Sequence, residues 1–470
     1  MRINRSNSNQ LVCAHLILVG PVIFSLGLIA FLQPWWLPDG LHVYDYQRWV
    51  EAFTLTLAGA AQVCAIKIES IRKKYFLCVV SLLFLASVSA ALSSIGWVSW
   101  VGILRLFLWS AVILSLPFVL ALFSKEQLAF FCASTAVPLF FYAVYTVIGT
   151  FVLLENGVYH RVFVVSGFAN VNHAAGFLML ATLLMPVLSV ESSRFGRAFP
   201  FLCGCAASVF LFLLIVIGSR GSWLAGSMAL LSLVVIFRGS ASRRYLAKCG
   251  NYLVAGIALF LLMQGLRLLQ GIDGAVSAKS ITSDSGRVDL YLTAIKGVLV
   301  NPWFGQGLLS FSADSNSVYG HPHNIVLSSL YELGIPFTLL ATIFAGALAV
   351  RLVSDRKEIG GDFSSVGGMA VVVSFLVHSQ FSGLSMIPAT LVIVAIGGGL
   401  AFRRLVLNTD FHRRQSCSVS TFAVFSACSI AYILALSLYW ADTSEDTKQK
   451  TRFWLNGDTA PWLKNHREFE

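Results

Sequence analysis

The sequence predicts an all-α polytopic membrane protein with about 12–13 transmembrane helices and a long outer loop that contains amphipathic helices. Of its 470 residues, 57% are hydrophobic and only 12% are charged, whereas roughly a quarter of the residues in soluble domains are charged. Apolar runs of about 18 residues or more, which cross ~30 Å of hydrocarbon as an α-helix, recur along the chain. The first run is longer than the core of a signal peptide, so we expect it to remain as a span.

Alternation of apolar runs with polar loops predicts about 13 spans in one bundle. The first nine spans occupy 1–270, an outer loop follows at 271–334, the last spans occupy 335–440, and a polar tail at 441–470 is expected outside. The expected spans cover residues 11–33, 49–66, 75–93, 97–123, 127–154, 173–190, 199–218, 222–237, 251–270, 335–350, 365–381, 386–402 and 418–440.

The basic residues predict the orientation of this bundle. The amino end MRINRSNSNQ and the loops KIESIRKK, RGSASRRYLAK and RRLVLNTDFHRR fall on one side when the spans alternate. Because loops rich in Lys and Arg stay in the cytoplasm, the net charge of +11 indicates membrane orientation and no nucleic-acid partner. The nine cysteines lie in or beside apolar runs, so we expect neither a disulfide framework nor a metal cluster.

Two arginines lie in or beside apolar spans. Arg105 falls within the fourth span, where either a structural ion pair with Glu51 or a functional role would explain it. Arg220 lies in the tight turn GSRGS between two spans. Its fixed fork of donors suits phosphate binding, and its long stem equally suits a contact with lipid headgroups.

The longest polar segment contains an expected amphipathic helix near the membrane surface. Arg287 falls in its first turn, where a cation opposes the helix dipole, which hints at a ligand; a solvated surface charge is the alternative. Asn301-Pro302 ends the helix, and Gly305-Gln306-Gly307 predicts a flexible turn. The apolar positions with helical spacing are Val288, Tyr291 or Leu292, Ile295 and Leu299.

The next motif, HPHNIVLSSLYELG, begins a second helix and is the best candidate for acid–base chemistry. His323 can act as a base near neutral pH, and Asn324 can orient a polar substrate. His321 and His323 are too close together, with no third ligand nearby, for a zinc site. We also count His321 and Glu332, in the same motif, among the candidate substrate-binding residues.

The segment GFANVNHAAG opens the sixth span, after Arg161. Asn170, Asn172 and His173 lie where a helix begins, so at least one of them is expected to cap the helix. We take Asn172 and Arg161 as further candidates for substrate binding because both fall on the predicted outer side.

Together these motifs resemble the O-antigen ligase/polymerase superfamily. The shared features are a tight SRG hairpin, an arginine-bearing outer helix followed by NPxFGxG, and HxHNxxLxxLxExG. Upstream, RVFVVSGFANVNHAAGFL resembles a segment that these enzymes share with bacterial protein O-oligosaccharyltransferases. The similarity extends from about 161 to 350. Outside that range, the first four spans match the family only in being apolar, and the tail matches only in being polar.

The resemblance implies a GT-C-like fold and an inverting, metal-independent glycosyl transfer at the periplasmic face of a bacterial inner membrane, with no cofactor. A glycan would pass from undecaprenyl diphosphate to an acceptor hydroxyl. By position, Arg220 and Arg287 match the arginines held to bind the diphosphate. His323 matches the histidine at the acceptor, and Arg161 matches a further basic residue. Tyr291 stands where these proteins often have Trp, so its packing role is open.

The residue chemistry agrees with a metal-independent transfer, because arginines stabilise a diphosphate leaving group and a histidine can accept the hydroxyl proton. The first hypothesis is a ligase that acts on lipid A-core, and its alternatives are a protein O-oligosaccharyltransferase that modifies Ser/Thr, for example in pilin, or an O-antigen polymerase. A transporter of an anionic substrate is the rival from another class, but it would place its charges near the middle of the bilayer. The lipid bilayer is a partner in every case.

Overall fold

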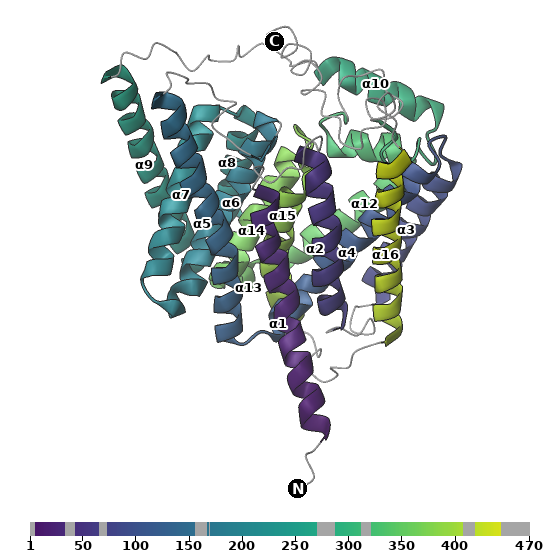
Figure 1. The fold of residues 1–470 in the computed structure, drawn as a ribbon, viewed down its shortest axis with the longest axis horizontal. Coiled ribbons are helices and arrows are strands. Elements are labelled where there is room, and N and C mark those ends of the chain that lie inside the picture. Colours follow the sequence, from purple (N-terminus) through teal and green to yellow (C-terminus); the bar gives the residue numbers. More distant parts are fainter. Residues whose placement is uncertain are drawn as a thin grey trace.

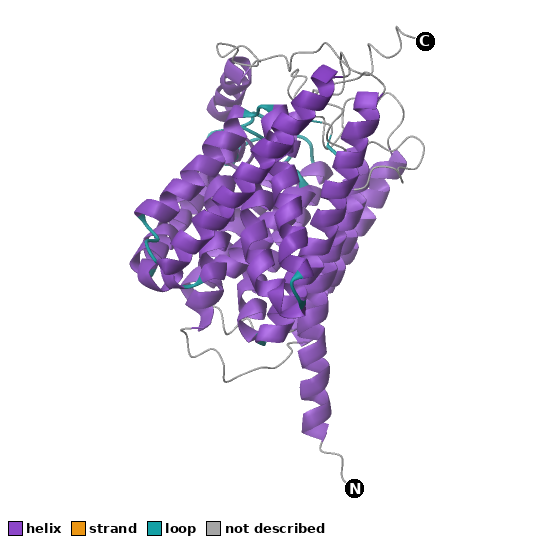
Figure 2. Ribbon diagram, turned by 90° about the vertical axis from the view of Figure 1, so that its left-hand side faces the viewer, coloured by secondary structure: helices purple, strands orange, loops and turns teal. Residues whose placement is uncertain are grey.

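The computed structural model of the chain is a bundle of α-helices, with no strand among the residues that it describes (Figures 1 and 2). These residues are 5–32, 43–64, 73–155, 167–168, 170–269, 287–311, 321–407 and 419–442. The α-helices are α1 (Arg5–Leu32), α2 (Val43–Cys64), α3 (Lys73–Leu92), α4 (Trp97–Leu122), α5 (Lys125–Glu155), α6 (Val171–Glu191), α7 (Ala198–Ile217), α8 (Arg220–Val235), α9 (Ser240–Leu269), α10 (Arg287–Val300), α12 (Ile325–Ser354), α13 (Arg356–Gly361), α14 (Phe363–His378), α15 (Pro388–Leu407) and α16 (Val419–Asp442). Two short 3-10 helices are η3 (Ser192–Phe195) and η4 (Leu384–Met386).

The predicted class, an all-α polytopic membrane protein, is confirmed. Among the described residues, 7 helices are long and apolar enough to cross a membrane, namely α4, α5, α6, α7, α9, α12 and α15. Shorter apolar helices lie in α1, α3, α8, α14 and α16. The remaining expected span is α2, which carries Asp45, Arg48 and Glu51. Each expected span therefore corresponds to a helix, while the number that cross the bilayer, the division into regions and the orientation stay predictions.

The centre of the bundle is α6. Every residue of α6 from His173 to Ser189 is buried, and the helix contacts α5, α7, α8, α14 and α15. A helix that is apolar all round is typical of a buried core position. The polar first turn of α6 is thereby placed inside the bundle, at the end opposite to the N-terminus (Figure 1).

The amphipathic helix expected after the polar loop is α10, which lies at the same end of the bundle (Figure 1). Leu290 and Ala294 are buried against Phe311 and Tyr331 of the neighbouring segment and helix α12. The other face exposes apolar side chains, which fits a helix at a membrane surface. These side chains are Val288, Leu292, Ile295 and Leu299.

The turn expected after α10 is present and is hydrogen-bonded to α12, while its flexibility stays a prediction. The backbone of the turn forms hydrogen bonds with a kinked part of α12. The N–H of Gln306 donates to the carbonyl of Tyr331 at 2.8 Å, and the N–H of Ile335 donates to the carbonyl of Pro302 at 2.8 Å. The kink is at Gly334 (φ 80, ψ 178), where a Cβ would lie 2.3 Å from the carbonyl oxygen of Trp303. Helix α12 therefore begins at Ile325 and continues past the expected boundary at 334/335. It can do so because the turn after α10 supplies hydrogen-bond partners for the backbone groups that the kink at Gly334 leaves unpaired.

Candidate functional site

The candidate site is built around the α14–α15 turn, residues 379–387, at the end of the bundle that also holds α10. Three consecutive carbonyl groups of this turn accept hydrogen bonds from the predicted site segments. Ser379 O accepts from the backbone N–H of Ile325 at 2.9 Å, and Gln380 O accepts from the Asn324 amide at 3.3 Å. Phe381 O accepts from Nη2 of Arg287 at 3.2 Å. The segment between the expected spans 365–381 and 386–402, together with the end of the first of them, therefore joins the starts of α10 and α12.

Arg287 points into this site. It is the first residue of α10 and is partly buried, with its guanidinium on the carbonyl of Phe381. Its charge also acts on His323, so the two side chains lie near each other. The contact with Phe381 shows that Arg287 is not a fully solvated surface charge, while ligand binding by Arg287 stays a prediction.

Arg220 approaches the same turn from another helix. Gly218 closes α7 in the left-handed conformation (φ 67), and Arg220 then begins α8. The next residue, Gly221, lies against α14, since a Cβ there would be 3.2 Å from Nε2 of His378 and 3.7 Å from Cβ of Phe381. Arg220 itself is exposed at this end of the bundle. Phe381 is thus a neighbour of both arginine-bearing segments.

Three buried histidines lie side by side, and one of them, His323, lies near Arg287. His173 comes from the first turn of α6, and His321 and His323 precede α12. The ring centroids are 4.2 Å apart for His321 and His323, 5.8 Å for His173 and His321, and 6.4 Å for His173 and His323. The expectation that no third possible ligand is near His321 and His323 is therefore wrong, because helix packing places His173 beside them.

The hydrogen bonding of His321 argues against the use of these histidines as a metal site. Nitrogen atoms of the three rings lie within 4.8 Å of one another. However, Nδ1 of His321 accepts the backbone N–H of His323 at 3.1 Å. A neutral imidazole has one donor and one acceptor nitrogen, so the proton of His321 belongs on Nε2. Metal-bound histidines have the opposite arrangement, in which the second nitrogen donates.

His323 is held in its neutral form. Burial lowers the pKa of His323 well below the ordinary value of 6.5, and the neighbouring His321, His173 and Arg287 lower it further. Its backbone has a positive φ of 54°, which is uncommon for a residue with a side chain and often marks functional sites. A neutral ring offers a lone pair that can accept a proton or a hydrogen bond from a hydroxyl group.

The asparagines of the two motifs begin helices. The side chain of Asn324 accepts hydrogen bonds from the backbone N–H groups of Val326 and Leu327, which makes it the N-cap of α12. Asn170 caps α6 in the same way by accepting from the backbone N–H of Asn172, as expected for one of these residues. Asn172 is partly buried in the first turn of α6. The geometry thus gives Asn324 a structural use, while substrate binding by Asn172 stays a prediction.

Two further candidates take part in packing around the turn after α10. The carboxylate of Glu332 is buried and accepts hydrogen bonds from the backbone N–H groups of Leu309 and Phe311. Tyr291 packs against the cluster between α10 and α12, which answers the question about its packing role. Substrate binding by either residue gains no support from these contacts. Arg161 lies outside the described residues.

Two features of the site were missed at the level of sequence. His378 ends α14 in a buried position, with Gly176 of α6 and Gly221 of α8 against its ring. The α14–α15 turn follows it directly. A histidine at the predicted outer end of an apolar span, followed by SQFSG, is the signal that could have indicated both.

Comparison with known proteins gives one match. Residues 205–342 match a family model described as O-antigen ligase, and no curated protein matches the chain. The matched segment extends from α7 into α12 and contains Arg220, Arg287, His321 and His323. It confirms the resemblance drawn from the motifs and supports a glycosyltransferase of the O-antigen ligase/polymerase type that uses lipid-linked glycans.

Proposed function

Proceeding from this family match, we propose that the protein is an O-antigen ligase that joins a glycan to lipid A-core. The donor in this proposal is an undecaprenyl-diphosphate-linked glycan, the reaction takes place at the periplasmic face of the bacterial inner membrane, and no metal is required. The observation that carries the proposal is the meeting of Arg287 and the Arg220–Gly221 segment at Phe381, beside the neutral His323.

The arginines suit the leaving group. In the transfer, the acceptor oxygen forms a bond to the anomeric carbon while the bond from that carbon to the phosphate oxygen breaks. The diphosphate leaves with the electron pair, so negative charge develops on its oxygens. Arg220 and Arg287 would bind that charge through their planar forks of donors. Cations placed in advance where charge develops stabilise a transition state without a metal.

The histidine suits the acceptor. His323 would accept a hydrogen bond from the attacking hydroxyl and take its proton as the new bond forms. Burial is the main cause of the low pKa of His323, and the charge of Arg287 lowers that pKa further. A bound diphosphate would offset that charge and raise the pKa. His323 would therefore become a stronger base when the donor is in place.

The proposal is tested by reconstitution of the purified protein in vesicles that contain an undecaprenyl-diphosphate-linked oligosaccharide. Lipid A-core and a Ser/Thr-containing pilin peptide are offered in parallel, and glycan transfer is measured by mass spectrometry in the presence of EDTA. We expect transfer to lipid A-core and loss of transfer in Arg287→Ala. Transfer to the peptide alone would establish a protein O-oligosaccharyltransferase, and glycan polymers without either product would establish a polymerase. Absence of any transfer would contradict the glycosyltransferase proposal.

The variant Arg351→Ala is a matched control for Arg287→Ala. Arg351 is a partly exposed arginine in the last turn of α12 that pairs with Asp355, the residue after the helix. It lies far along the helix from its start at Ile325. Both variants lose one positive charge, but only Arg287→Ala removes a group from the candidate site. Equal loss of transfer in the two variants would point to general destabilisation instead of a role in the reaction.

A further inference from the structure

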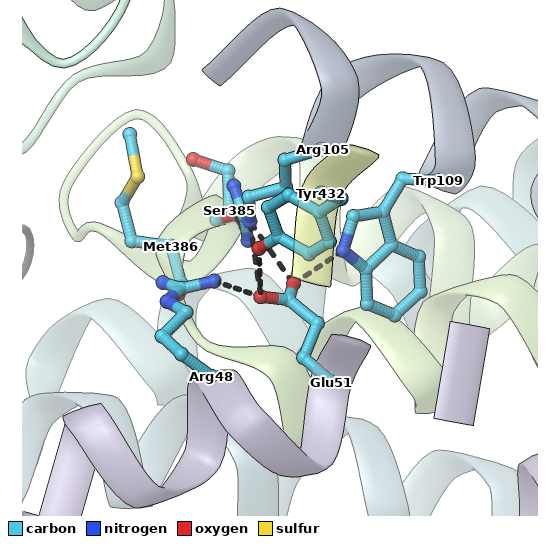
Figure 3. A network of polar contacts seen from close by, with 7 residues as sticks. All are labelled: Arg48, Glu51, Arg105, Trp109, Ser385, Met386 and Tyr432. Carbon is cyan, nitrogen blue, oxygen red and sulfur yellow. Dashed lines mark hydrogen bonds and ion pairs between the residues drawn. The ribbon is translucent and has the colours of Figure 1, made fainter. Parts of the chain in front are cut away.

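A buried carboxylate, that of Glu51, lies between two arginines beside the α14–α15 turn (Figure 3). Glu51 of α2 is fully buried and forms ion pairs with Arg48 of the same helix and with Arg105 of α4. The distance from Nε of Arg105 to Oε1 of Glu51 is 3.0 Å. The indole N–H of Trp109 and, at 3.4 Å, the hydroxyl of Tyr432 in α16 also donate to it. One of the two interpretations of Arg105, an ion pair with Glu51, is thus confirmed, within a larger network.

The two arginines of this network also bind the α14–α15 turn. Nη2 of Arg48 donates to the carbonyl of Met386, which is 338 residues away in sequence. Nη2 of Arg105 donates to the carbonyl of Ser385 at 3.4 Å. Glu51 orients both guanidinium groups, since it accepts from each of them. The turn is therefore held on this side by α2 and α4.

The opposite side of the same turn carries the candidate site. Phe381 O accepts from Arg287, and Gly383 lies against the ring of His321, where a Cβ would come 2.0 Å from Nε2. Nδ1 of His321 in turn accepts the backbone N–H of His323 at 3.1 Å. A continuous series of contacts therefore leads from Glu51 through Arg48, Met386, Gly383 and His321 to His323.

The chemistry of the network indicates that stability alone does not explain it. Two guanidinium groups face one carboxylate, and both Glu51 and Arg48 are buried. Removal of such charges from water opposes folding, so a buried ion pair is weak evidence for a stabilising role. A fixed fork of donors, by contrast, holds its partners in defined positions. Here the partners are the backbone carbonyls of Ser385 and Met386, on the turn that supports His321.

We propose that Arg48, Glu51 and Arg105 are positioning residues for the transfer reaction. They hold the α14–α15 turn so that Gly383 supports His321, which in turn sets the position of His323 toward the acceptor hydroxyl. This inference rests on the proposed function, and it adds to that function a set of residues that act without contact with the substrate.

The main test is Glu51→Gln in the purified full-length protein. The amide keeps the size of the side chain and one acceptor oxygen but removes the charge that orients both arginines. We expect kcat for transfer from the undecaprenyl-diphosphate glycan to fall by about 100-fold, because small displacements of catalytic groups have effects of this order. KM for the donor should change less than kcat, since the side chains of Arg220 and Arg287 are retained, although Arg287 contacts Phe381 of the same turn.

A second measurement follows the histidines themselves and requires no transfer. Diethyl pyrocarbonate modifies accessible imidazoles, and mass spectrometry of the peptide that contains His321 and His323 gives the rate. Both residues are buried, so we expect slow modification in the wild type and faster modification in Glu51→Gln. This measurement separates the positioning inference from the proposed function, because it remains informative if the wild type transfers no glycan.

The matched control is Ser115→Ala, which breaks a buried hydrogen bond between the same two helices without contact with the turn. Ser115 in α4 donates to the side chain of Gln62 in α2 at 2.8 Å. Wild-type kcat and histidine modification are expected in this variant. Arg105→Lys is the second test variant, because lysine keeps the positive charge but lacks the planar fork of guanidinium donors. If Glu51→Gln does not fold, Arg105→Lys takes its place in the test.

Three outcomes would overturn the inference. In the first, folded Glu51→Gln or Arg105→Lys retains wild-type kcat and slow histidine modification, which would show that the network does not position the site. In the second, KM for the donor rises strongly while histidine modification is unchanged, which would show that the arginines act on the substrate directly. Faster modification in Ser115→Ala as well would reduce the effect to general loosening of α2 against α4, and would also overturn it.

Discussion

The backbone N–H of His323 donates to Nδ1 of His321 at 3.1 Å, across a single intervening proline. The bond accompanies a positive φ of 54° at His323. It assigns the proton of His321 to Nε2. The ring centroids of His323 and His173 are 6.4 Å apart. This local geometry determines which nitrogen atoms are available for chemistry, and several predictions depend on it.

Replacement of His323 with alanine should remove transfer while the protein still inserts and folds. General base catalysis typically contributes ~10²–10⁴-fold, so we expect kcat to fall by about that factor. Binding of undecaprenyl diphosphate, measured by quenching of intrinsic fluorescence, should be unchanged because the arginines remain. Near-normal kcat in His323→Ala would exclude this residue as the base.

The two arginines should behave differently from His323. Arg220→Ala and Arg287→Ala are expected to weaken binding of undecaprenyl diphosphate and to lower kcat/KM by about 10²–10³-fold each, because each removes a preorganised donor from a developing charge. Lysine variants should recover little, since an ammonium group lacks the bidentate fork. Equilibrium binding and transfer assays on the same preparations provide the measurement. Wild-type binding in both alanine variants would contradict a diphosphate site.

The pH dependence of kcat/KM should follow the lowered pKa of His323. Its pKa lies well below 6.5 because of burial and of the nearby His321, His173 and Arg287. The neutral, proton-accepting form therefore persists below the pH at which an ordinary histidine is half protonated. We expect kcat/KM, which reports the free enzyme, to be constant from about pH 8 to pH 6.5 and to fall only at lower pH. A midpoint at pH 6.5 or above would contradict this assignment.

Substitution of Gly334 should destabilise the protein. Its φ is 80°, and a Cβ would lie 2.3 Å from the carbonyl oxygen of Trp303. Alanine at a position with positive φ costs more than ~1 kcal/mol, apart from the clash. A Cβ on Gly346, in the same helix, would have no neighbour within 4 Å, so Gly346→Ala should stabilise by about 0.5–1 kcal/mol. Thermal unfolding in detergent measures both, and equal effects would contradict the role of the kink.

Transfer should continue after removal of metal ions. The proton on Nε2 of His321 follows from its bond to His323, and it prevents the three histidines from offering three lone pairs to one ion. We expect equal transfer rates before and after dialysis against EDTA, with calcium-saturated EDTA as the control. Loss of transfer that is restored by zinc would show that the His321–His323 bond opens to form a metal site.

Much of the fold is readable in the sequence because the information is local. Long apolar runs determine where helices form, since backbone polar groups in a membrane must be satisfied within the helix. The same holds for the start of α12, where Asn324 caps the helix through bonds to Val326 and Leu327. Arg220, Arg287 and His323 could be selected for the same reason, as polar residues that interrupt apolar segments at one predicted side.

The roles of other residues depend on contacts that sequence spacing does not reveal. Glu332 belongs to a motif with His323, yet its carboxylate binds the backbone of Leu309 and Phe311. His173 reads as a helix-capping residue, yet the burial of α6 places its ring next to His321.

The sequence by itself determined the class of the protein, the positions of its helices and the arginines and histidine that resemble a transferase site. Only the tertiary structure decided that the segments carrying these residues meet at the α14–α15 turn. It also decided that Arg48 and Arg105, oriented by Glu51, bind the carbonyl groups of this turn. The physical reason is the range of the interactions. Helix formation depends on neighbours within a few residues, whereas Arg48 reaches Met386 across 338 residues of chain through side-chain packing of the whole bundle.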